Sequence, residues 1–403
     1  MRFRSVLVSA LLATVVLALP SGATAAGPRP ITLRFPRFDV PPNTDREVCT
    51  FVRVPMEHAY DLAGQVIASV GVHPAAGNTS HHFLIWAYTG TAIDGFAPVE
   101  GKIVDSTGCL DLAPDASQRL MLGGIQTPRG AGHYPKGLAL RMEPVPSASG
   151  PAVGFIMNSH WINNSAKTVH GAVRVKLLPA RGAVKKYVKP IFEVVANAFI
   201  DVPPGEVRTS GWKWQPGGHD LASGLGGSEV PQGPACVLSL TGHMHKWGTL
   251  FSADLIDAGG ARTPLLEFAR YDHPPLRQFL PGLLVNVGDR IEYACTHDNG
   301  VGNEPRLGCE EEPGVTPGLS IMAALQAGRG IGSNPAKRCA QPGVDAVACP
   351  ATDPGYPGRS FTGLCVPARQ VFGFTSHDEM CILPGTYYDA DTTAAPGHEC
   401  DVD

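Results

Sequence analysis

Two histidines one residue apart, His243 and His245, stand in the apolar stretch TGHMHKWGTL and are the first candidate metal ligands of this chain. In a β-strand, residues i and i+2 point to the same face, so both imidazoles can reach one ion. Thr241 would share that face, while Met244 would point the other way, into the core. The same pair can also be two surface or hydrogen-bonded histidines, and the motif alone leaves both interpretations open.

A second pair, His81 and His82, follows the turn AAGNTS and opens the apolar run HHFLIWAY. Adjacent strand residues point to opposite faces, so both rings can reach one metal only at a strand end or a bulge. The preceding turn predicts a strand start here. His160, in the apolar stretch FIMNSHWINN, is a third histidine on a predicted strand, where a lone histidine is ordinarily a satisfied core residue.

Met380, in GFTSHDEMCILPG, adds a thioether to this set. A lone methionine in a β-rich region is ordinarily core packing. Thioether sulfur is a soft ligand that suits Cu(I), and imidazole suits copper in both oxidation states. Two histidines with one methionine therefore indicate copper rather than zinc or iron.

Short runs of β-branched and aromatic residues, bounded by Gly, Pro or Asn, must position these side chains. The chain contains 47 Gly and 37 Pro, and neither half shows a long helical periodicity. The sequence predicts an all-β fold of two tandem antiparallel β-sandwich (jelly-roll-like) domains, with a disulfide-rich insertion in the second. We place the first sandwich at 30–180, a basic linker at 181–190 and the second sandwich at 191–403.

The insertion spans about 300–370 and is rich in Gly and Pro. It carries four cysteines and one possible short helix, LSIMAALQAG. A loop of this length in a compact domain is usually functional or an insertion. Its acidic run CEEEP could attract a cationic substrate or form a solvated loop face.

Residues 1–25 have the pattern of a secretory signal peptide, with Arg2 and Arg4, an apolar core and an A-x-A cleavage site. No other apolar run approaches the roughly 20 residues of a transmembrane helix, so we expect no membrane span. A net charge of −4 without basic clusters argues against a nucleic-acid partner. Ten cysteines without a C-x-x-C pair predict five disulfides in a secreted or periplasmic protein and argue against thiolate zinc sites.

The motifs HHFLIWAY, NSHWINN, GHMHKWG, VNVGDRIEYACTHDNG and TSHDEMC occur in this order. Over about 45–400, with 300–370 as an insertion, the chain resembles the copper type II, ascorbate-dependent monooxygenases, the group of peptidylglycine α-hydroxylating monooxygenase and dopamine β-monooxygenase. The resemblance implies two copper ions per chain, one in each sandwich, facing a solvent cleft. It implies an electron-transfer site formed by His81, His82 and His160, and an oxygen-activating, catalytic site formed by His243, His245 and Met380.

Two residues are candidates for the third ligand of the first site. His133, in GHYPKG, is close enough in sequence to be the third ligand of the first site. We prefer His160, because its strand matches the ligand strand of the family. His297 and His377 are expected near the second site, either behind the ligands, in contact with substrate, or as surface histidines.

The resemblance implies hydroxylation of an unactivated C–H bond of a small organic substrate by O2, with an external one-electron reductant such as ascorbate. Peptide-hydroxylating members grip a substrate carboxylate at positions that are Thr241, Ile382 and Pro384 here, so a peptide C-terminus is not the expected substrate. The alternative is a non-catalytic copper-binding or storage protein on the same scaffold. An iron cupin would place Glu shortly after H-x-H, where KWGTLF stands, and a metal-free sandwich would leave three His/Met clusters unexplained.

The family pattern also implies three disulfides, Cys295–Cys381, Cys236–Cys400 and Cys49–Cys109. The four insertion cysteines would then pair among themselves in one of three ways, their positions being Cys309, Cys339, Cys349 and Cys365.

Overall fold

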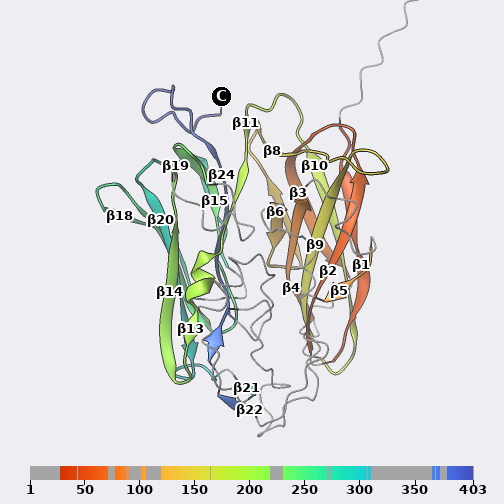
Figure 1. The fold of residues 1–403 in the computed structure, drawn as a ribbon, viewed down its shortest axis with the longest axis vertical. Coiled ribbons are helices and arrows are strands. Elements are labelled where there is room, and N and C mark those ends of the chain that lie inside the picture. Colours follow the sequence, from red (N-terminus) through yellow and green to blue (C-terminus); the bar gives the residue numbers. More distant parts are fainter. Residues whose placement is uncertain are drawn as a thin grey trace, which may run out of the picture.

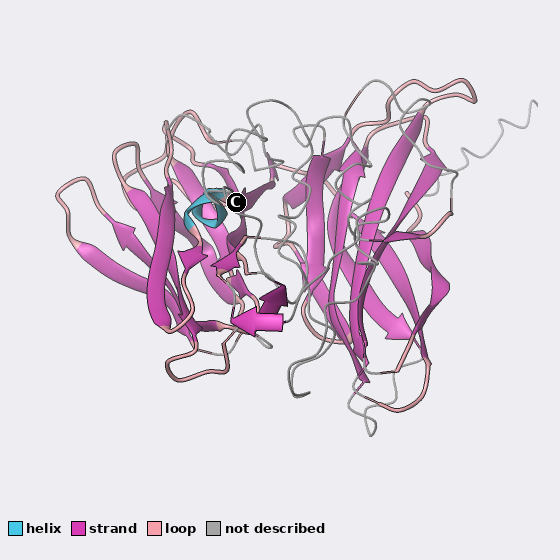
Figure 2. Ribbon diagram, turned by 60° about the horizontal axis from the view of Figure 1, so that its bottom comes forward, coloured by secondary structure: helices cyan, strands magenta, loops and turns pink. Residues whose placement is uncertain are grey.

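The computed structural model describes residues 28–42, 44–70, 78–88, 90, 101–105, 119–163, 165–217, 230–269, 271, 274–305, 307–309, 365–367, 369–372 and 379–402. Across these ranges the chain forms strands, turns and one 3-10 helix, η3 (Val195–Phe199). The strands assemble into several mainly antiparallel sheets, which confirms the predicted all-β fold. Figures 1 and 2 show two groups of sheets side by side, and the colours of Figure 1 show the earlier part of the chain in one group and the later part in the other.

The N-terminal group contains two sheets. The outer sheet has the order β1 (Ile31–Val40), β10 (Val169–Pro179), β3 (Tyr60–Val70), β8 (Leu138–Met142) and β11 (Lys186–Tyr187), with β7 (Arg129–His133) also on β3. The inner sheet has the order β5 (Val104–Asp105), β2 (Thr44–Pro55), β9 (Ala152–Asn163), β4 (Asn78–Tyr88) and β6 (Arg119–Ile125). The core between them is aromatic and aliphatic, with Phe35, Phe83 and Trp161 fully or almost fully buried.

Strand β9 carries a histidine on the face that points away from this core. Nearly all of its residues are buried, so both faces of the strand are covered. Phe155, Met157 and Trp161 belong to the core between the sheets. Because side chains alternate between faces, Asn158 and His160 point to the opposite side of the sheet.

The C-terminal group also contains two sheets. One has the order β12 (Lys189–Glu193), β24 (Cys381–Asp389), β15 (Ala235–Leu240) and β19 (Arg277–Val285), with β16 (His243–Met244) on β24. The other has the order β14 (Glu206–Trp214), β20 (Arg290–Asn299), β17 (Gly248–Ile256) and β18 (Arg262–Phe268). Trp214, Phe251 and Tyr387 fill the space between these sheets. We call the N-terminal group the first sandwich and the C-terminal group the second sandwich.

The segment predicted as a linker, 181–190, contains β11 and the start of β12 in its second half. Strand β11 pairs in parallel with β8 of the first group, and β12 pairs with β24 of the second. Between them, the Val188 amide donates to the Ala139 carbonyl at 2.8 Å. Val188 is buried with Leu138 of the first group and Leu238 and Tyr388 of the second. The two groups are therefore joined by a shared apolar cluster at the crossing point.

The ends of the insertion meet. Strands β21 (Leu307–Cys309) and β22 (Cys365–Pro367) pair antiparallel, with Cys309 opposite Cys365 in the register. A second short pair, β13 (Asp201–Val202) with β23 (Gln370–Val371), follows directly. The chain thus leaves the second sandwich and returns to it at one place. Residues 310–364, with Cys339, Cys349 and the possible helix, lie outside the described residues, as does the signal peptide.

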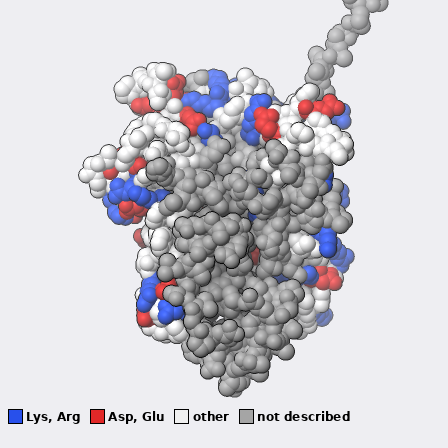
Figure 3. Space-filling view, viewed as in Figure 1, with Lys and Arg blue, Asp and Glu red and all other residues white. Residues whose placement is uncertain are grey.

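Two of the implied disulfides are present, Cys236–Cys400 and Cys295–Cys381. Cys49 is also disulfide-bonded, and its expected partner, Cys109, lies outside the described residues. In the described part of the chain, no helix has the length and apolar character to cross a membrane. On the face shown in Figure 3, the described acidic and basic side chains are interspersed.

Candidate metal centre

Three histidines from strands β4 and β9 form the first cluster. The ligand atoms of His81, His82 and His160 all lie within 4.8 Å of one another. In the register, Ser80 pairs with Trp161 and His82 pairs with His160, so His81 is the extra residue of a bulge. A bulge is one of the two arrangements in which adjacent histidines can face one ion. The structure therefore brings together the three histidines expected at the first site.

The ring of His82 is oriented by a buried polar pair. Its Nε2 lies 3.1 Å from Asn158 Oδ1 and 3.4 Å from Glu47 Oε1. The Asn158 amide nitrogen donates to Glu47 Oε1 at 2.7 Å, which fixes the carboxamide with its oxygen toward His82. Both neighbours of Nε2 are acceptors, so we infer that Nε2 carries the hydrogen and that Nδ1 presents its lone pair.

The other ring nitrogen of His82, Nδ1, faces the ring of His81. Nδ1 of His81 and Nδ1 of His82 are 3.3 Å apart. A metal held tetrahedrally by imidazoles at about 2.0–2.1 Å would separate two ligand nitrogens by about 3.3 Å. The ring centroid of His160 is 5.0 Å from that of His81 and 4.9 Å from that of His82. The donor set therefore fits a metal ion bound by three imidazoles.

Burial and hydrogen bonds shift the pKa values of His82 and Glu47 in this cluster. Burial lowers the pKa of His82, against the opposing hydrogen bond to Glu47. Burial alone would raise the pKa of Glu47, but the hydrogen bonds from His82 and Asn158 and the nearby imidazoles outweigh it and hold that pKa below its ordinary value. A neutral imidazole beside an ionised carboxylate is the state that binds metal, because a protonated ring has no lone pair to donate.

The H-x-H pair of the second sandwich begins on the short strand β16, which contains His243 and ends directly before His245. His243 and His245 are both buried, and their ring centroids are 5.1 Å apart. Met244, between them, is fully buried in the core of the second sandwich, as the alternation predicts. Strand β16 pairs with β24, with His243 opposite Ile382 and Met244 opposite Cys381.

Continuing that register places Met380 opposite His245, on the same side of the sheet. Met380 is buried and packs with Phe372 and Ile382. Its neighbour, Cys381, is held by the disulfide to Cys295 on β20. The backbone N–H of Cys381 also donates to the Asn197 side chain of η3 at 2.6 Å. The start of β24 is thereby anchored next to the H-x-H strand.

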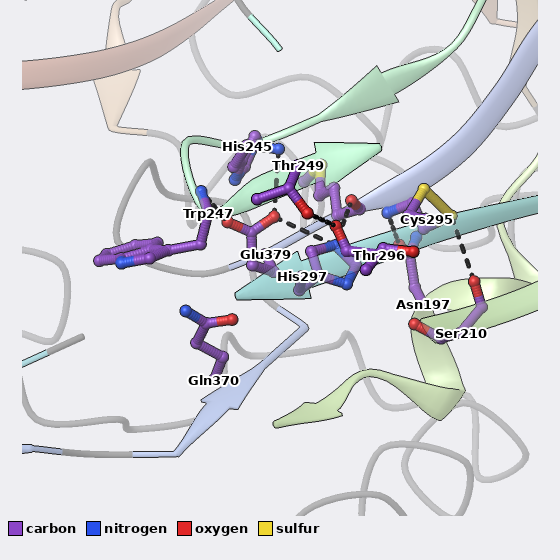
Figure 4. Close-up of polar contacts among 12 residues, drawn as sticks. Asn197, Ser210, His245, Trp247, Thr249, Cys295, Thr296, His297, Gln370 and Glu379 are labelled. Carbon is purple, nitrogen blue, oxygen red and sulfur yellow. Dashed lines mark hydrogen bonds and ion pairs between the residues drawn. A yellow bond between two sulfur atoms is a disulfide. The ribbon is translucent and has the colours of Figure 1, made fainter. Parts of the chain in front are cut away.

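A fully buried carboxylate, Glu379, braces the loop after the H-x-H pair (Figure 4). It accepts hydrogen bonds from the backbone N–H of His245 at 3.2 Å and of Trp247 at 2.8 Å. His297, also fully buried, places Nε2 3.3 Å from the same carboxylate. Glu379 directly precedes Met380, so it connects the H-x-H loop to the segment that carries Met380.

The two clusters meet at the boundary between the sandwiches. The ring centroids of His82 and His243 are 5.6 Å apart, and His81 stacks on Tyr271 of the second sandwich at 6.0 Å. Burial, and then the neighbouring imidazoles with His245 first, lower the pKa of His243 well below its ordinary value. The resemblance implies two sites facing a solvent cleft, whereas here five imidazoles form one continuous group, in which His81 is half-buried and the other four are buried.

Of the remaining candidate residues, some lie near this histidine group and one lies apart from it. His133 is exposed on β7, which belongs to the outer sheet, so it lies apart from the inner-sheet histidines. Thr241 and Ile382 flank β16, where the Thr241 amide donates to the Pro384 carbonyl at 2.9 Å. His297 is buried beside Glu379, so the interpretation as a surface histidine is wrong. His377 lies outside the described residues.

Four polar residues of the centre do not stand out in the sequence: Glu47, Gln126, Asn158 and Glu379. Asn158 had a usable signal, because it stands two residues before His160 and shares its strand face. Glu379 directly precedes Met380 in the DEMC motif. Glu47 and Gln126 come from strands or turns without any metal-ligand pattern.

Comparison of the chain with protein-family models and with curated proteins gave no match. The fold and the histidine group are therefore the basis of the functional proposal, together with the motif order.

Proposed function

We propose that this protein is an exported dicopper monooxygenase that hydroxylates an unactivated C–H bond of a small organic substrate. The observation that carries the proposal is the group of five imidazoles, four buried and His81 half-buried. Three have ligand atoms within 4.8 Å of one another, and two from the second sandwich lie beside them. The first ion would be held by His81, His82 and His160. The second would be held by His243, His245 and the Met380 thioether, a set that favours copper over zinc.

Copper, when bound, would supply the electron-transfer and oxygen chemistry, with electrons from an external one-electron reductant such as ascorbate. The chain's own contribution is orientation and protection from water. Asn158 and Glu47 hold the His82 ring with Nδ1 toward the cluster. Glu379 holds the backbone of the H-x-H loop. Burial keeps His82 and His243 neutral, which leaves their lone pairs available at neutral pH.

The substrate proposed here is small and does not dock through a peptide carboxylate. The positions that would grip such a carboxylate are Thr241, Ile382 and Pro384, none of which carries a charge or a side-chain amide. Ile382 packs with Met380 and Phe372 in an apolar cluster next to the second site. Apolar surroundings favour a substrate with an apolar reacting carbon.

The described disulfides and the signal-peptide pattern support a secreted or periplasmic location for this enzyme. Disulfides form and persist in oxidising compartments. Those are also the compartments in which an exported copper protein would acquire its metal.

The proposal predicts one copper ion at each site in protein matured in an oxidising compartment. His160→Ala should lose the first ion, and Met380→Ala should weaken Cu(I) binding at the second. His133→Ala, an exposed histidine of the outer sheet, is the matched control and should retain both ions. Metal analysis with a Cu(I) competition titration measures these outcomes.

Oxygen uptake with ascorbate and a panel of small organic compounds separates the enzyme from the non-catalytic alternative. Substrate-dependent uptake with a hydroxylated product supports the monooxygenase. Full copper loading without any turnover would favour copper storage. Wild-type protein without copper at either site would refute both functions.

A further inference from the structure

A glutamine of the first sandwich reaches the H-x-H motif of the second. Gln126 stands in the turn between β6 and β7, where the chain passes from the inner sheet to the outer sheet. Its side-chain nitrogen donates to the carbonyl of Gly242 at 3.3 Å. Its side-chain oxygen lies 3.0 Å from Nδ1 of His243. One carboxamide thus contacts two consecutive residues of the motif.

These two contacts determine which nitrogen of His243 is protonated. The Gly242 carbonyl can only accept, so the amide nitrogen of Gln126 must face it. The amide oxygen then faces Nδ1 of His243, and an amide oxygen can only accept. Nδ1 must therefore carry the hydrogen, which leaves the lone pair on Nε2.

The backbone at Gly242 is rigidly placed. A Cβ atom at this position would lie 2.7 Å from the ring of Phe251, so no side chain fits there. Phe251 is fully buried in the core of the second sandwich. The carbonyl that orients Gln126 is therefore tied to that core.

We propose that Gln126 is a positioning residue for the second metal site: it presents Nε2 of His243 as the metal-binding atom and makes that site depend on the packing of the first sandwich. This inference rests on the proposed function. It goes beyond it because a residue of one domain sets the tautomer of a ligand in the other. The second site is then fully arranged only while the two sandwiches are in contact.

The test uses the full-length protein and begins without metal. Nitrogen chemical shifts of ¹⁵N-labelled histidine report the tautomer, with His243 assigned through a His243→Gln variant. Wild-type His243 should show the Nδ1–H form. Gln126→Leu, which has similar size and no polar atoms, should lose this preference. Gln126→Glu keeps an acceptor at Nδ1 and should retain it.

The control is Thr127→Val, the next residue of the same turn, whose hydroxyl donates only locally, to the Arg129 carbonyl at 2.8 Å. It should leave the tautomer unchanged. In Cu(I) competition, Gln126→Leu should weaken the second site by about 10- to 100-fold and leave the first site unchanged.

The two possible failures can be told apart. Wild-type protein that binds copper, with Gln126→Leu changing neither tautomer nor affinity, would overturn this inference and leave the proposed function standing. A tautomer that responds to Gln126→Leu in a protein that takes up no copper would refute the proposed function and the metal-positioning role together. An effect of Thr127→Val equal to that of Gln126→Leu would show that the turn, and not the carboxamide, is responsible.

Discussion

At the scale of residues, two imidazoles of the centre have one ring nitrogen engaged by a neutral or acidic acceptor. His82 is fixed through Nε2 by Asn158, and His243 through Nδ1 by Gln126. The two histidines therefore present different nitrogens toward the interior of the group. A hydrogen-bonded partner of this kind fixes both the tautomer and the ring orientation of a metal ligand.

The variant Asn158→Leu tests the orienting role of such a partner at the first site. The substitution removes the nearer of the two acceptors at His82 Nε2 and the side-chain amide that donates to Glu47. Copper affinity at the first site should fall by about 10- to 100-fold. The free energy of unfolding should fall by about 1–3 kcal/mol, because a buried carboxylate loses a donor. Competition titration and urea unfolding measure the two effects.

The matched control is Ser159→Ala on the opposite face of β9. Ser159 is fully buried and accepts a hydrogen bond from the Trp161 ring N–H at 2.9 Å. The Ser159→Ala substitution should lower the free energy of unfolding without changing copper affinity. Equal weakening of the first site by both variants would mean that general disruption of β9, and not the contact to His82, is responsible.

At the scale of elements, strands place the ligands by pairing with neighbours that are themselves anchored. Strand β4 carries a bulge against β9, and β16 is held by β24 and its disulfide to β20. In the outer sheet, the hydroxyl of Tyr60 on β3 donates to the Leu177 carbonyl of β10 at 3.1 Å. Burial raises the pKa of Tyr60 to about 12.

That shift predicts a loss of stability at alkaline pH. In the unfolded chain, Tyr60 ionises near its ordinary pKa of about 10, whereas the folded state resists ionisation up to about pH 12. The contribution of Tyr60 is therefore fully present below pH 10 and is lost as the pH rises through the interval to about 12. Tyr60→Phe should make unfolding free energy less dependent on pH in this interval.

Urea unfolding at a series of pH values measures that dependence. Tyr187→Phe is the control, because Tyr187 is an exposed tyrosine. An unchanged pH slope in Tyr60→Phe would contradict the prediction.

At the scale of the whole molecule, the two sandwiches are held together where the chain crosses between them. Leu138 and Val188 pack against Leu238 and Tyr388 in a cluster that belongs to both. The histidine group lies at the same boundary, as the stacking of His81 on Tyr271 shows. The relative placement of the domains therefore decides whether five imidazoles are adjacent.

Leu138→Ala should weaken that placement. Truncating a buried leucine costs about 2–5 kcal/mol, and here the cavity would open between the sandwiches. We expect a larger radius of gyration by small-angle X-ray scattering in the variant. Leu140→Ala on the same strand is the control, since Leu140 belongs to the core of the first sandwich alone. It should lower stability without expansion, and a radius unchanged in Leu138→Ala would argue against the role of this cluster.

The sequence predicted much of the fold and part of the centre. Alternation of apolar and polar residues indicated strands, and the two-residue period placed His243 and His245 together with Met244 in the core, as the structure shows. The resemblance correctly implied the two disulfides that the described residues contain. Segment 181–190 was predicted as a linker, and residues in its second half pair as strand with β8 and β24.

By itself, then, the sequence determined the element type and the shared facing of His243 and His245, because both follow from spacing along one strand. The bulge that lets His81 and His82 face one point arises only from the pairing of β4 with β9. Only the tertiary structure decided that His82 and His243 are neighbours, and that Gln126, Asn158 and Glu379 orient the centre. These contacts join residues more than 70 positions apart through hydrogen bonds to single nitrogens and carbonyls. Such contacts depend on how sheets and domains pack, and no local period or spacing encodes them.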